Sequence, residues 1–247
     1  MGGGQSLGPM LNLRLVRPDK IVKVTTIDDL RGVKEFDDRV EFGAALTHAE
    51  FEDGELPAPI GGMMQYVASG IAYRAVRNRG TIGGSICHAD PAADWVSALT
   101  ALDASIRIKC SDGSERIATF IGFMQGAYRV DLGNDEIVTA VIVPRYSARS
   151  VWGYYKICRK VGEFADAIAV WVADPEKRYS RVVFGSTAGA PLISQALSSA
   201  IAQTGKVPNA DAVKKELLQL VPDLDRVKLQ MLTVSLQRCV NQALNNE

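Results

Sequence analysis

Two short glycine clusters constrain this chain more than any other feature of its sequence. Residues 2–6 read GGGQS and residues 81–85 read TIGGS, so each cluster ends in a hydroxyl side chain. Glycine weakens helices and strands, and a cluster of glycines is typical of backbone that bends sharply or lies close to another group. Consecutive N–H groups without side chains form concave binding sites for anions. We predict two loops that hold a pyrophosphate from both sides, while the alternative that the glycines only serve turns stays open.

Other common nucleotide and metal motifs do not occur in the sequence. There is no G-x-G-x-x-G, and TGKV at 204–207 lacks both the upstream glycine and the hydroxyl residue of a P-loop. The four cysteines contain no C-x-x-C pair, so they predict free thiols rather than a zinc site, an iron–sulfur cluster or a disulfide framework. They are Cys87, Cys110, Cys158 and Cys239.

The remaining polar candidates point to binding rather than to acid–base catalysis. His48 and His88 are the only histidines, too few for a histidine-rich metal site, and Ser85, His88 and Asp94 lack the G-x-S-x-G of a nucleophile elbow. Asp94 is expected either to accept from a sugar or polyol hydroxyl or to complement a helix dipole. Lys156 is either a strand residue whose ammonium reaches solvent or a cation held near a ligand. We expect no catalytic residue and no metal ligand.

The charge balance bears on the class of partner. Lys plus Arg number 28 and Asp plus Glu number 28, giving a formal net charge of zero over 247 residues. A neutral chain argues against a protein that coats nucleic acid or an anionic membrane. The sequence has no apolar run of about 18 residues and no leader-like start, so we expect a cytoplasmic chain without a membrane span.

Hydrophobic periodicity predicts an α+β fold in two parts. In the first part we expect strands at 21–24, 39–46 and 135–144, a hairpin over 104–120, a helix over 59–80, and a helix capped by Asp90 with Pro91 at its first position. In the second part we expect a small sheet backed by helices, with strands at 152–157, 167–172 and 181–186 and helices at 191–202, 210–220 and 225–244. The last helix carries one apolar face, made of Leu229, Leu232, Leu236, Val240 and Ala243.

Four segments together resemble a known family, the FAD-binding medium subunits of the molybdenum hydroxylases, which include carbon monoxide dehydrogenase and xanthine dehydrogenase. They are GGGQSLGPMLNLRLVRPD, RNRGTIGGSICHADPAADW, DEIVTAVIVP and YYKICRKVGEFADAIAV. The resemblance implies an FAD-binding domain of the vanillyl-alcohol-oxidase-like type over residues 1–146 and the family's C-terminal domain over 147–247. Members of that family carry a strand–helix–strand stretch before the first glycine loop, and since Met1 stands directly before the loop we expect this chain to lack it.

The resemblance also implies which residues bind FAD. Two glycine segments would cradle its pyrophosphate, Asp94 would contact cofactor hydroxyls, Val138 would lie beside the cofactor, and Lys156 would lie near the flavin. The two segments are Gly2, Gly3, Gly4, Gln5, Ser6 and Leu7, and Thr81, Ile82, Gly83, Gly84 and Ser85.

As a family member the chain would be the electron-transfer subunit of an oxidoreductase complex. Electrons would pass from [2Fe–2S] clusters on a small subunit to FAD, and on to NAD, oxygen or another acceptor. A large subunit would carry the molybdenum cofactor, and the complex would be a dimer of heterotrimers. Two alternatives stay open: a scaffold subunit of the same complex that has lost its flavin, and a stand-alone FAD oxidase.

Overall fold

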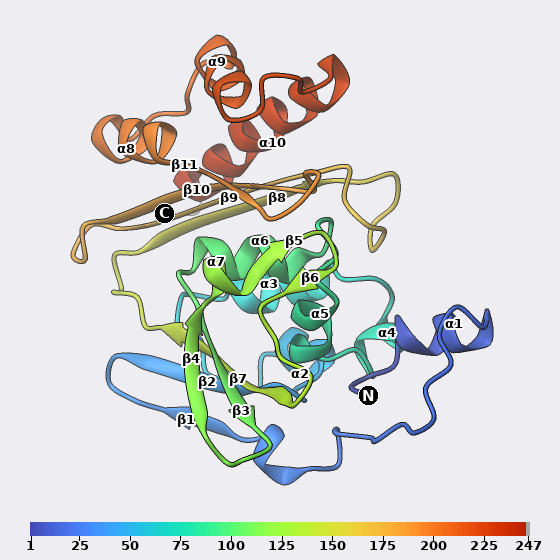
Figure 1. Ribbon diagram of the computed structural model, residues 1–247. Helices are drawn as coiled ribbons and strands as arrows, with labels where there is room; N and C mark the ends of the chain where they lie inside the picture. Colours follow the sequence, from blue (N-terminus) through green and yellow to red (C-terminus); the bar gives the residue numbers. More distant parts are fainter. Residues whose placement is uncertain (246–247) are drawn as a thin grey trace.

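The structure, a computed structural model that describes residues 1–245, arranges the chain in four layers (Figure 1). From bottom to top in that view lie a five-stranded sheet, a layer of helices, a four-stranded sheet and a second layer of helices. Neighbouring strands are antiparallel in both sheets. The predicted fold class, α+β with a second small sheet backed by helices, is confirmed.

The lower sheet contains the first part of the chain. Its strand order is β1 (Val33–Glu35), β2 (Arg39–Gly43), β7 (Glu136–Pro144), β3 (Ser105–Cys110) and β4 (Glu115–Thr119). Strands β3 and β4 form the predicted hairpin, and the long strand β7 lies between β2 and β3. Helix α6 (Asp94–Ala101) lies above this sheet among α3 (Met63–Ser69), α5 (Ile82–His88) and α7 (Phe120–Phe123) (Figure 1).

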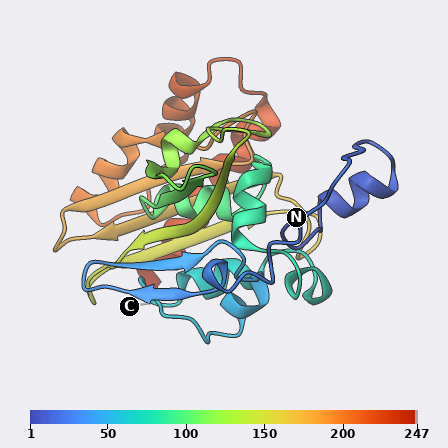
Figure 2. The same cartoon turned by 60° about the horizontal axis from the view of Figure 1, so that its bottom comes forward.

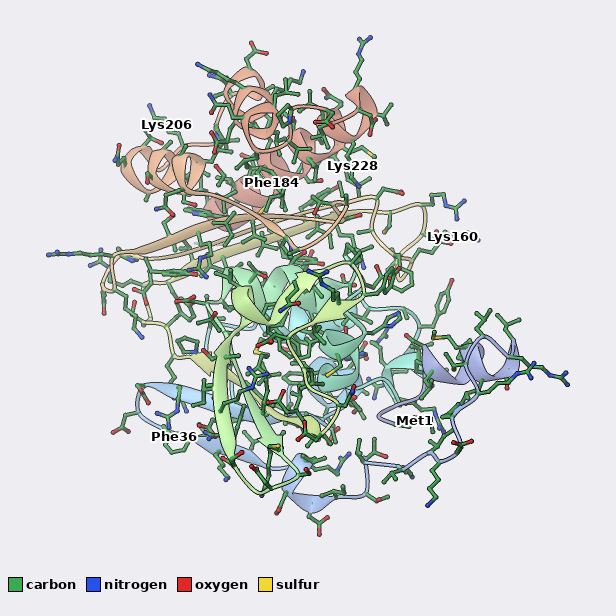
Figure 3. All side chains as sticks on the ribbon, in the orientation of Figure 1. Met1, Phe36, Lys160, Phe184, Lys206 and Lys228 are labelled. Carbon is green, nitrogen blue, oxygen red and sulfur yellow. The ribbon has the colours of Figure 1, made fainter. Side chains whose placement is uncertain are left out.

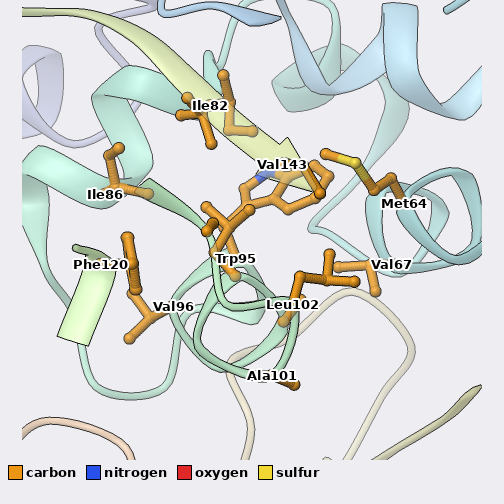
Figure 4. Packing of buried hydrophobic residues seen from close by; sticks show 14 of the residues in the cluster. Met64, Val67, Ile82, Ile86, Trp95, Val96, Ala101, Leu102, Phe120 and Val143 are labelled. Carbon is orange, nitrogen blue, oxygen red and sulfur yellow. The ribbon is translucent and has the colours of Figure 1, made fainter. Parts of the chain in front are cut away.

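The first hydrophobic core fills the space around α6. Figure 4 shows Trp95 surrounded by buried side chains that come from several elements, among them Ile86, Val96 and Leu102. Trp95, Val96, Leu99 and Leu102 are fully buried, as the helical spacing of Trp95, Leu99 and Leu102 predicts. The tight core fixes where the first turn of α6 lies, and this turn carries Asp94.

The upper sheet is buried on both faces. Its strand order is β11 (Leu192–Ser194), β10 (Tyr179–Gly185), β9 (Ala167–Asp174) and β8 (Val151–Ile157). Every residue of β9 is buried, because Ile168, Val170 and Val172 belong to the core below while Ala169 and Trp171 belong to the core above. Successive side chains of a strand point to opposite faces, so this continuous apolar run serves two cores.

The upper core is covered by three helices, which are α8 (Gln195–Thr204), α9 (Ala210–Leu220) and α10 (Arg226–Asn245). The predicted apolar face of the last helix packs here, with Leu232, Leu236, Val240 and Ala243 buried and Leu229 partly buried. At the other end of the chain, α1 (Leu7–Asn12) stands away from the rest of the molecule, as Figure 2 shows.

Several local predictions were wrong. Residues 21–24 form no strand, although Val24 donates a backbone hydrogen bond to Met1 over 3.1 Å. The helix expected over 59–80 is interrupted, because α3 ends at Ser69 and a short α4 (Arg74–Arg77) follows a turn in which Ala72 has a φ of 45°. The helix expected from Asp90 begins at Asp94 instead, and the carboxylate of Asp90 accepts from the Ala92 amide.

Other elements had no prediction. They are the 3₁₀ turn Asp28–Leu30, strand β1, helix α2 (His48–Glu52) and the two-stranded ribbon β5 (Met124–Gly126) and β6 (Arg129–Val130). Most are short, and short elements carry too few residues to show a clear period. The helix expected over 191–202 begins only at Gln195, because Leu192–Ser194 pair with β10 as strand β11 and Ser194 caps the helix by accepting from the Leu197 amide.

The packing of β8 against α10 predicts a cost for any side chain at Gly153. A Cβ there would lie 2.0 Å from the Cys239 carbonyl oxygen, which is backbone and cannot rotate away. We expect Gly153→Ala to lower the free energy of unfolding by about 2 kcal/mol, since overpacking forces backbone shifts. Urea unfolding measures this, with Gly61→Ala as the control because a Cβ at Gly61 meets nothing within 4 Å. Equal losses in the two variants would contradict the close approach.

Candidate functional site

One cavity of about 460 Å³ brings the two glycine segments together. One side is formed by Gly2 to Leu7, and another by Thr81, Gly84 and Ser85. Asp94 reaches the cavity from the start of α6, while the loop residues 162–164 and the turn 71–72 complete the wall. Figure 3 labels Met1 and Lys160, which lie on the side of the molecule that carries α1.

The two glycine segments touch each other directly. A Cβ on Gly2 would lie 2.9 Å from Thr81 Oγ1, and a Cβ on Gly3 would lie 1.8 Å from the carbonyl oxygen of Arg79, two residues before that segment. Neither position accepts a larger residue without displacement of the chain around residues 79–81. Glycine at these positions is therefore required by the close approach of two pieces of backbone, and this approach places both segments on one cavity.

The first glycine segment presents unused backbone donors. Among residues 1–245 no acceptor is found for the amides of Gly2, Gly3, Gly4, Gln5 and Ser6. Gly4 has a φ of 72°, the left-handed conformation that glycine adopts without strain. Successive N–H groups around such a bend form a concave nest for an anion, and this segment lines the cavity.

The second glycine segment is built differently from the sequence prediction. It is the first turn of α5 rather than a loop, with Thr81 as its N-cap. Its amides are already used: Ile82 donates to Leu46 O over 3.0 Å and Gly83 to Ala44 O over 2.9 Å. The amides of Gly84 and Ser85 both donate to Thr81, over 3.0 Å each. The expectation that this segment offers free backbone N–H groups is therefore wrong for Ile82 to Ser85, while the Thr81 amide has no acceptor within residues 1–245.

The glycines of the second segment serve packing and access. A Cβ on Gly83 would lie 2.6 Å from the Ala44 carbonyl oxygen, so Gly83 lets α5 lie against the lower sheet. Gly84 is exposed and lines the cavity, and a Cβ there would meet only Thr81 Oγ1, at 2.9 Å. The segment thus offers a bare surface flanked by the side chains of Thr81 and Ser85.

A buried polar cluster holds Asp94 at the cavity. Lys156 Nζ lies 2.7 Å from Asp94 Oδ1, and the Tyr154 hydroxyl donates to the same oxygen over 2.6 Å. Lys156 also donates to Gly70 O over 2.9 Å. Burial raises the pKa of Asp94, while the ammonium of Lys156 and the Tyr154 hydroxyl oppose that rise. The sequence prediction did not include Tyr154, whose role depends on a contact 60 residues away along the chain.

Not every predicted site residue lines this cavity. Ile82, Gly83 and Val138 are buried in the packed interior, and Lys156 lies behind Asp94. A second hollow, of about 790 Å³ beside Trp171, is lined by none of the predicted residues. The structure therefore divides the predicted set into residues that face the cavity and residues that support its walls.

His48 is a cavity residue that the sequence prediction set aside. It is 5% exposed, its Nδ1 accepts from Trp95 Nε1 over 3.0 Å, and it lines the cavity. A sequence pattern was available for its helix, because Thr47 and Glu50 form the S/T-x-x-E pair of a capping box, and the structure contains that box. The pairing of His48 with Trp95, 47 residues apart, has no local pattern.

Arg77 fixes the wall opposite the glycine segments. Its guanidinium donates to Ile71 O and Ala72 O, each over 2.9 Å, and pairs with Glu52 over 2.7 Å. The loop that follows β8 leans on this turn, since a Cβ on Gly162, whose φ is 92°, would lie 2.3 Å from Ala72 O. Arg77 therefore orients the turn on which the 162–164 loop rests.

The structure also bears on metals and membranes. Across residues 1–245 no group of three or more His, Cys, Asp or Glu side chains is placed to hold a metal ion. No helix in that range is long and apolar enough to cross a bilayer.

Comparisons with known proteins show the family to which this fold, with its cavity lined by both glycine segments, belongs. The family described as "FAD binding domain in molybdopterin dehydrogenase" matches residues 1–146. The nicotine 6-hydroxylase medium subunit of Paenarthrobacter nicotinovorans is 32% identical over 214 residues, which is 86% of this chain and 71% of that protein. The caffeine dehydrogenase subunit beta of Pseudomonas sp. (strain CBB1) is 30% identical over 80% of this chain and 68% of that protein.

Solved structures show the same fold. Carbon monoxide dehydrogenase from Hydrogenophaga pseudoflava, in a form that lacks the Mo-pyranopterin moiety of its cofactor, superposes with a TM-score of 0.87 at 27% identity, covering 99% of this chain and 88% of that chain. The chain belongs to the family of FAD-binding medium subunits of the molybdenum hydroxylases, a class of oxidoreductases. Its cofactor is FAD, as the resemblance implied.

The buried pair of Lys156 and Asp94 predicts a large loss of stability when one partner is removed. Their side chains are 9% and 7% exposed, so Lys156→Met leaves a buried carboxylate without its cation. We expect the free energy of unfolding to fall by about 3–5 kcal/mol, and the double variant with Asp94→Asn to recover most of it. The control is Arg159→Met, whose exposed pair with Glu163 is expected to contribute less than about 1 kcal/mol. Similar small losses in both single variants would contradict the buried pair.

The burial of His48 predicts a specific dependence of stability on pH. Burial, together with the positive charge of Arg77, lowers the pKa of His48 from 6.5 to about 4. The unfolded chain takes up this proton as the pH falls below 6.5 while the folded chain does not, so stability is full above that pH and is lost toward pH 4. Relative to His48→Asn, the wild type is expected to lose about 3 kcal/mol over this interval. Urea unfolding at a series of pH values measures the difference, and parallel profiles would contradict it.

Proposed function

We propose that this chain holds FAD in the cavity between residues 2–7 and 81–85 and serves as the electron-transfer subunit of a molybdenum hydroxylase. In this proposal electrons come from [2Fe–2S] clusters on a small partner subunit and leave to NAD, oxygen or another acceptor. The observation that carries it is the run of unused backbone donors from Gly2 to Ser6, which lines the cavity together with the exposed Gly84.

The residues present fit FAD on chemical grounds. A pyrophosphate requires several donors without bulky side chains, and the amides from Gly2 to Ser6 meet this requirement. The cavity volume of about 460 Å³ lies within the range of small-molecule sites, which is roughly 300–1,000 Å³. Part of its wall is apolar, formed by Met10, Ile71, Val76 and Phe164, as a ring system requires.

Each predicted residue has a distinct task in this proposal. The amides of Gly2 to Ser6 bind the phosphates, and Leu7 begins the helix that ends the nest. Asp94, oriented by Lys156 and Tyr154, accepts a hydrogen bond from a cofactor hydroxyl. Thr81, Gly84 and Ser85 contact the cofactor directly, whereas Ile82, Gly83 and Val138 act through the packing that positions the wall.

When bound, FAD supplies the uptake and release of electrons, and the protein supplies binding and orientation. The chain's own contribution is to hold donors in place and to exclude water from the cavity. The apolar residues around the entrance serve this second purpose, and among them Phe164 is 65% exposed and lies on the wall next to Gly162.

We further propose the partners that the family resemblance implies: a large subunit with the molybdenum cofactor and a small [2Fe–2S] subunit, assembled as a dimer of heterotrimers in the cytoplasm. The names of two relatives, a medium subunit and a subunit beta, support assembly into a complex. Leu13, Leu15 and Val22 are 70%, 68% and 69% exposed, which suits a surface that meets other chains. The four free thiols suit a reducing compartment.

We also propose that residues 1–146 and 147–247 are distinct parts of the subunit, the first holding the phosphates and the second completing the cavity. The support is that Lys156, Tyr154 and the 162–164 loop come from the second part, while the glycine segments and Asp94 come from the first.

Substitution of Gly84 tests the cofactor site and leaves the hydrophobic core unchanged, because Gly84 is exposed. The side chain introduced by Gly84→Val projects from the bare surface that faces the cavity, so we expect the dissociation constant for FAD to rise at least about tenfold, since a ligand that fills its pocket tolerates no added bulk. The measurement is flavin fluorescence during titration of the protein, and the unfolding midpoint is expected to change little.

The matched control is Gly122→Val, because Gly122 has the same local structure away from the cavity. Thr119 caps α7 and accepts from the Gly122 amide over 3.2 Å, as Thr81 accepts from Gly84, and a Cβ on Gly122 would lie 3.1 Å from Thr119 Oγ1. Full FAD affinity is expected in this variant. Unchanged affinity in Gly84→Val, or equal losses in both, would overturn the site.

A further inference from the structure

The second glycine segment offers the cavity few backbone donors. The amides from Ile82 to Ser85 are all bonded within the protein, and in the described part of the chain only the Thr81 amide of this segment has no acceptor, so side-chain donors gain importance here. Thr81 and Ser85 offer hydroxyls there. A further side chain on this cavity is His48, which none of the predicted roles includes.

The contact with Trp95 decides which nitrogen of His48 carries the proton. An indole N–H only donates, so the 3.0 Å bond from Trp95 Nε1 requires His48 Nδ1 to be an unprotonated acceptor. In a neutral imidazole the proton then lies on Nε2. Trp95 is fixed in the core, as Figure 4 shows, so the ring of His48 is held in one orientation.

The Nε2 side of the ring is open. No acceptor for His48 Nε2 is present within the described part of the chain. The residue lines the cavity although only 5% of its surface is exposed. Gly80 leaves this nitrogen uncovered, since a Cβ on Gly80 would lie 2.9 Å from Nε2 and 2.8 Å from Cδ2. His48 Nε2 is not among the buried polar atoms that lack a partner, so this nitrogen is accessible from the cavity that the residue lines and is free to donate to a ligand there.

From this geometry we infer that His48 is a phosphate-binding residue, which donates its Nε2–H to the pyrophosphate of the nucleotide alongside the Gly2–Ser6 amides of the same cavity. The inference rests on the proposed FAD site and adds a donor to it. Trp95 is the positioning residue, because its indole N–H selects the tautomer that donates.

The charges around His48 favour a neutral donor. Arg77 on α4 repels a second positive charge at the ring, and burial adds to that effect. The carboxyl groups of Asp90, Asp94 and Glu163 line the same cavity. A neutral N–H binds the phosphate without forming a buried ion pair with these carboxylates, and its hydrogen bond does not depend on pH over the range in which the ring stays neutral.

The test compares three ligands with the full chain. FAD and ADP contain a pyrophosphate, and riboflavin does not, so a phosphate donor affects the first two only. His48→Asn keeps an amide oxygen at the position of Nδ1, which accepts from Trp95, and removes the Nε2 donor. We expect the affinities for FAD and ADP to fall together by about tenfold to a hundredfold while that for riboflavin is unchanged.

Further variants separate binding from folding. His48→Gln places an amide N–H near the position of Nε2 and is expected to recover part of the lost ADP affinity. Trp95→Phe frees the imidazole to change tautomer and is expected to weaken ADP binding. Its control, Trp171→Phe, removes a comparable indole bond, 3.1 Å to Ser180 Oγ in the upper core, and is expected to leave ADP binding intact. Unfolding midpoints show which variants are folded.

Imidazole ¹⁵N chemical shifts give a readout independent of affinity. We expect the Nε2-protonated neutral form in the free protein, and a shift of the Nε2–H proton when ADP is added. Failure of the wild type to bind FAD or ADP would overturn the proposed function. Binding by the wild type with equal affinity in folded His48→Asn, or an equal loss for riboflavin, would overturn the role of His48 alone.

Discussion

The complete burial of helix α6 is the constraint on which the cavity depends. All eight residues from Asp94 to Ala101 are buried between the two sheets, so a polar group on this helix is satisfied only by a partner inside the protein. Among the side chains of this helix the Ser97 hydroxyl has no partner in the described part of the chain, whereas Asp94 and Trp95 have theirs. Asp94 finds Lys156 and Tyr154, and the indole N–H of Trp95 finds His48. The first turn of α6 thus carries two neighbouring side chains that shape the cavity. Asp94 is an acceptor at its wall, and Trp95 orients His48, which also lines it.

The two glycine segments look alike in the sequence but perform different tasks. In the first, the chain leaves its amides unbonded around the left-handed bend at Gly4. In the second, Thr81 caps a helix and the following amides are satisfied internally, so glycine serves the close packing of Gly83 against Ala44 and the bare surface at Gly84. The difference arises from what lies next to each segment, and composition alone does not reveal it.

The parts of the fold that the sequence predicts correctly are those with a long period or a strong turn. The hairpin around residues 111–114, the doubly buried β9 and the apolar face of α10 belong to this group. The interruption of the helix at Gly70 was not predicted, because it follows from carbonyl groups held by Lys156 and Arg77 rather than from local propensity. Tyr154 and His48 were not predicted for the same reason, because their partners lie 60 and 47 residues away along the chain.

The same pairing argues that the cavity is a joint product of both parts of the chain. Residues 1–146 match the FAD-binding family, yet the cation that neutralises Asp94 lies on β8, at Lys156. The loop that closes the wall follows β8, and its Gly162 rests on the turn that Arg77 orients. A buried carboxylate without its cation is costly, so the first part alone would carry an uncompensated charge at its own binding site. The upper sheet therefore does more than cover the core, because it supplies the positive charge that pairs with Asp94 at the cavity.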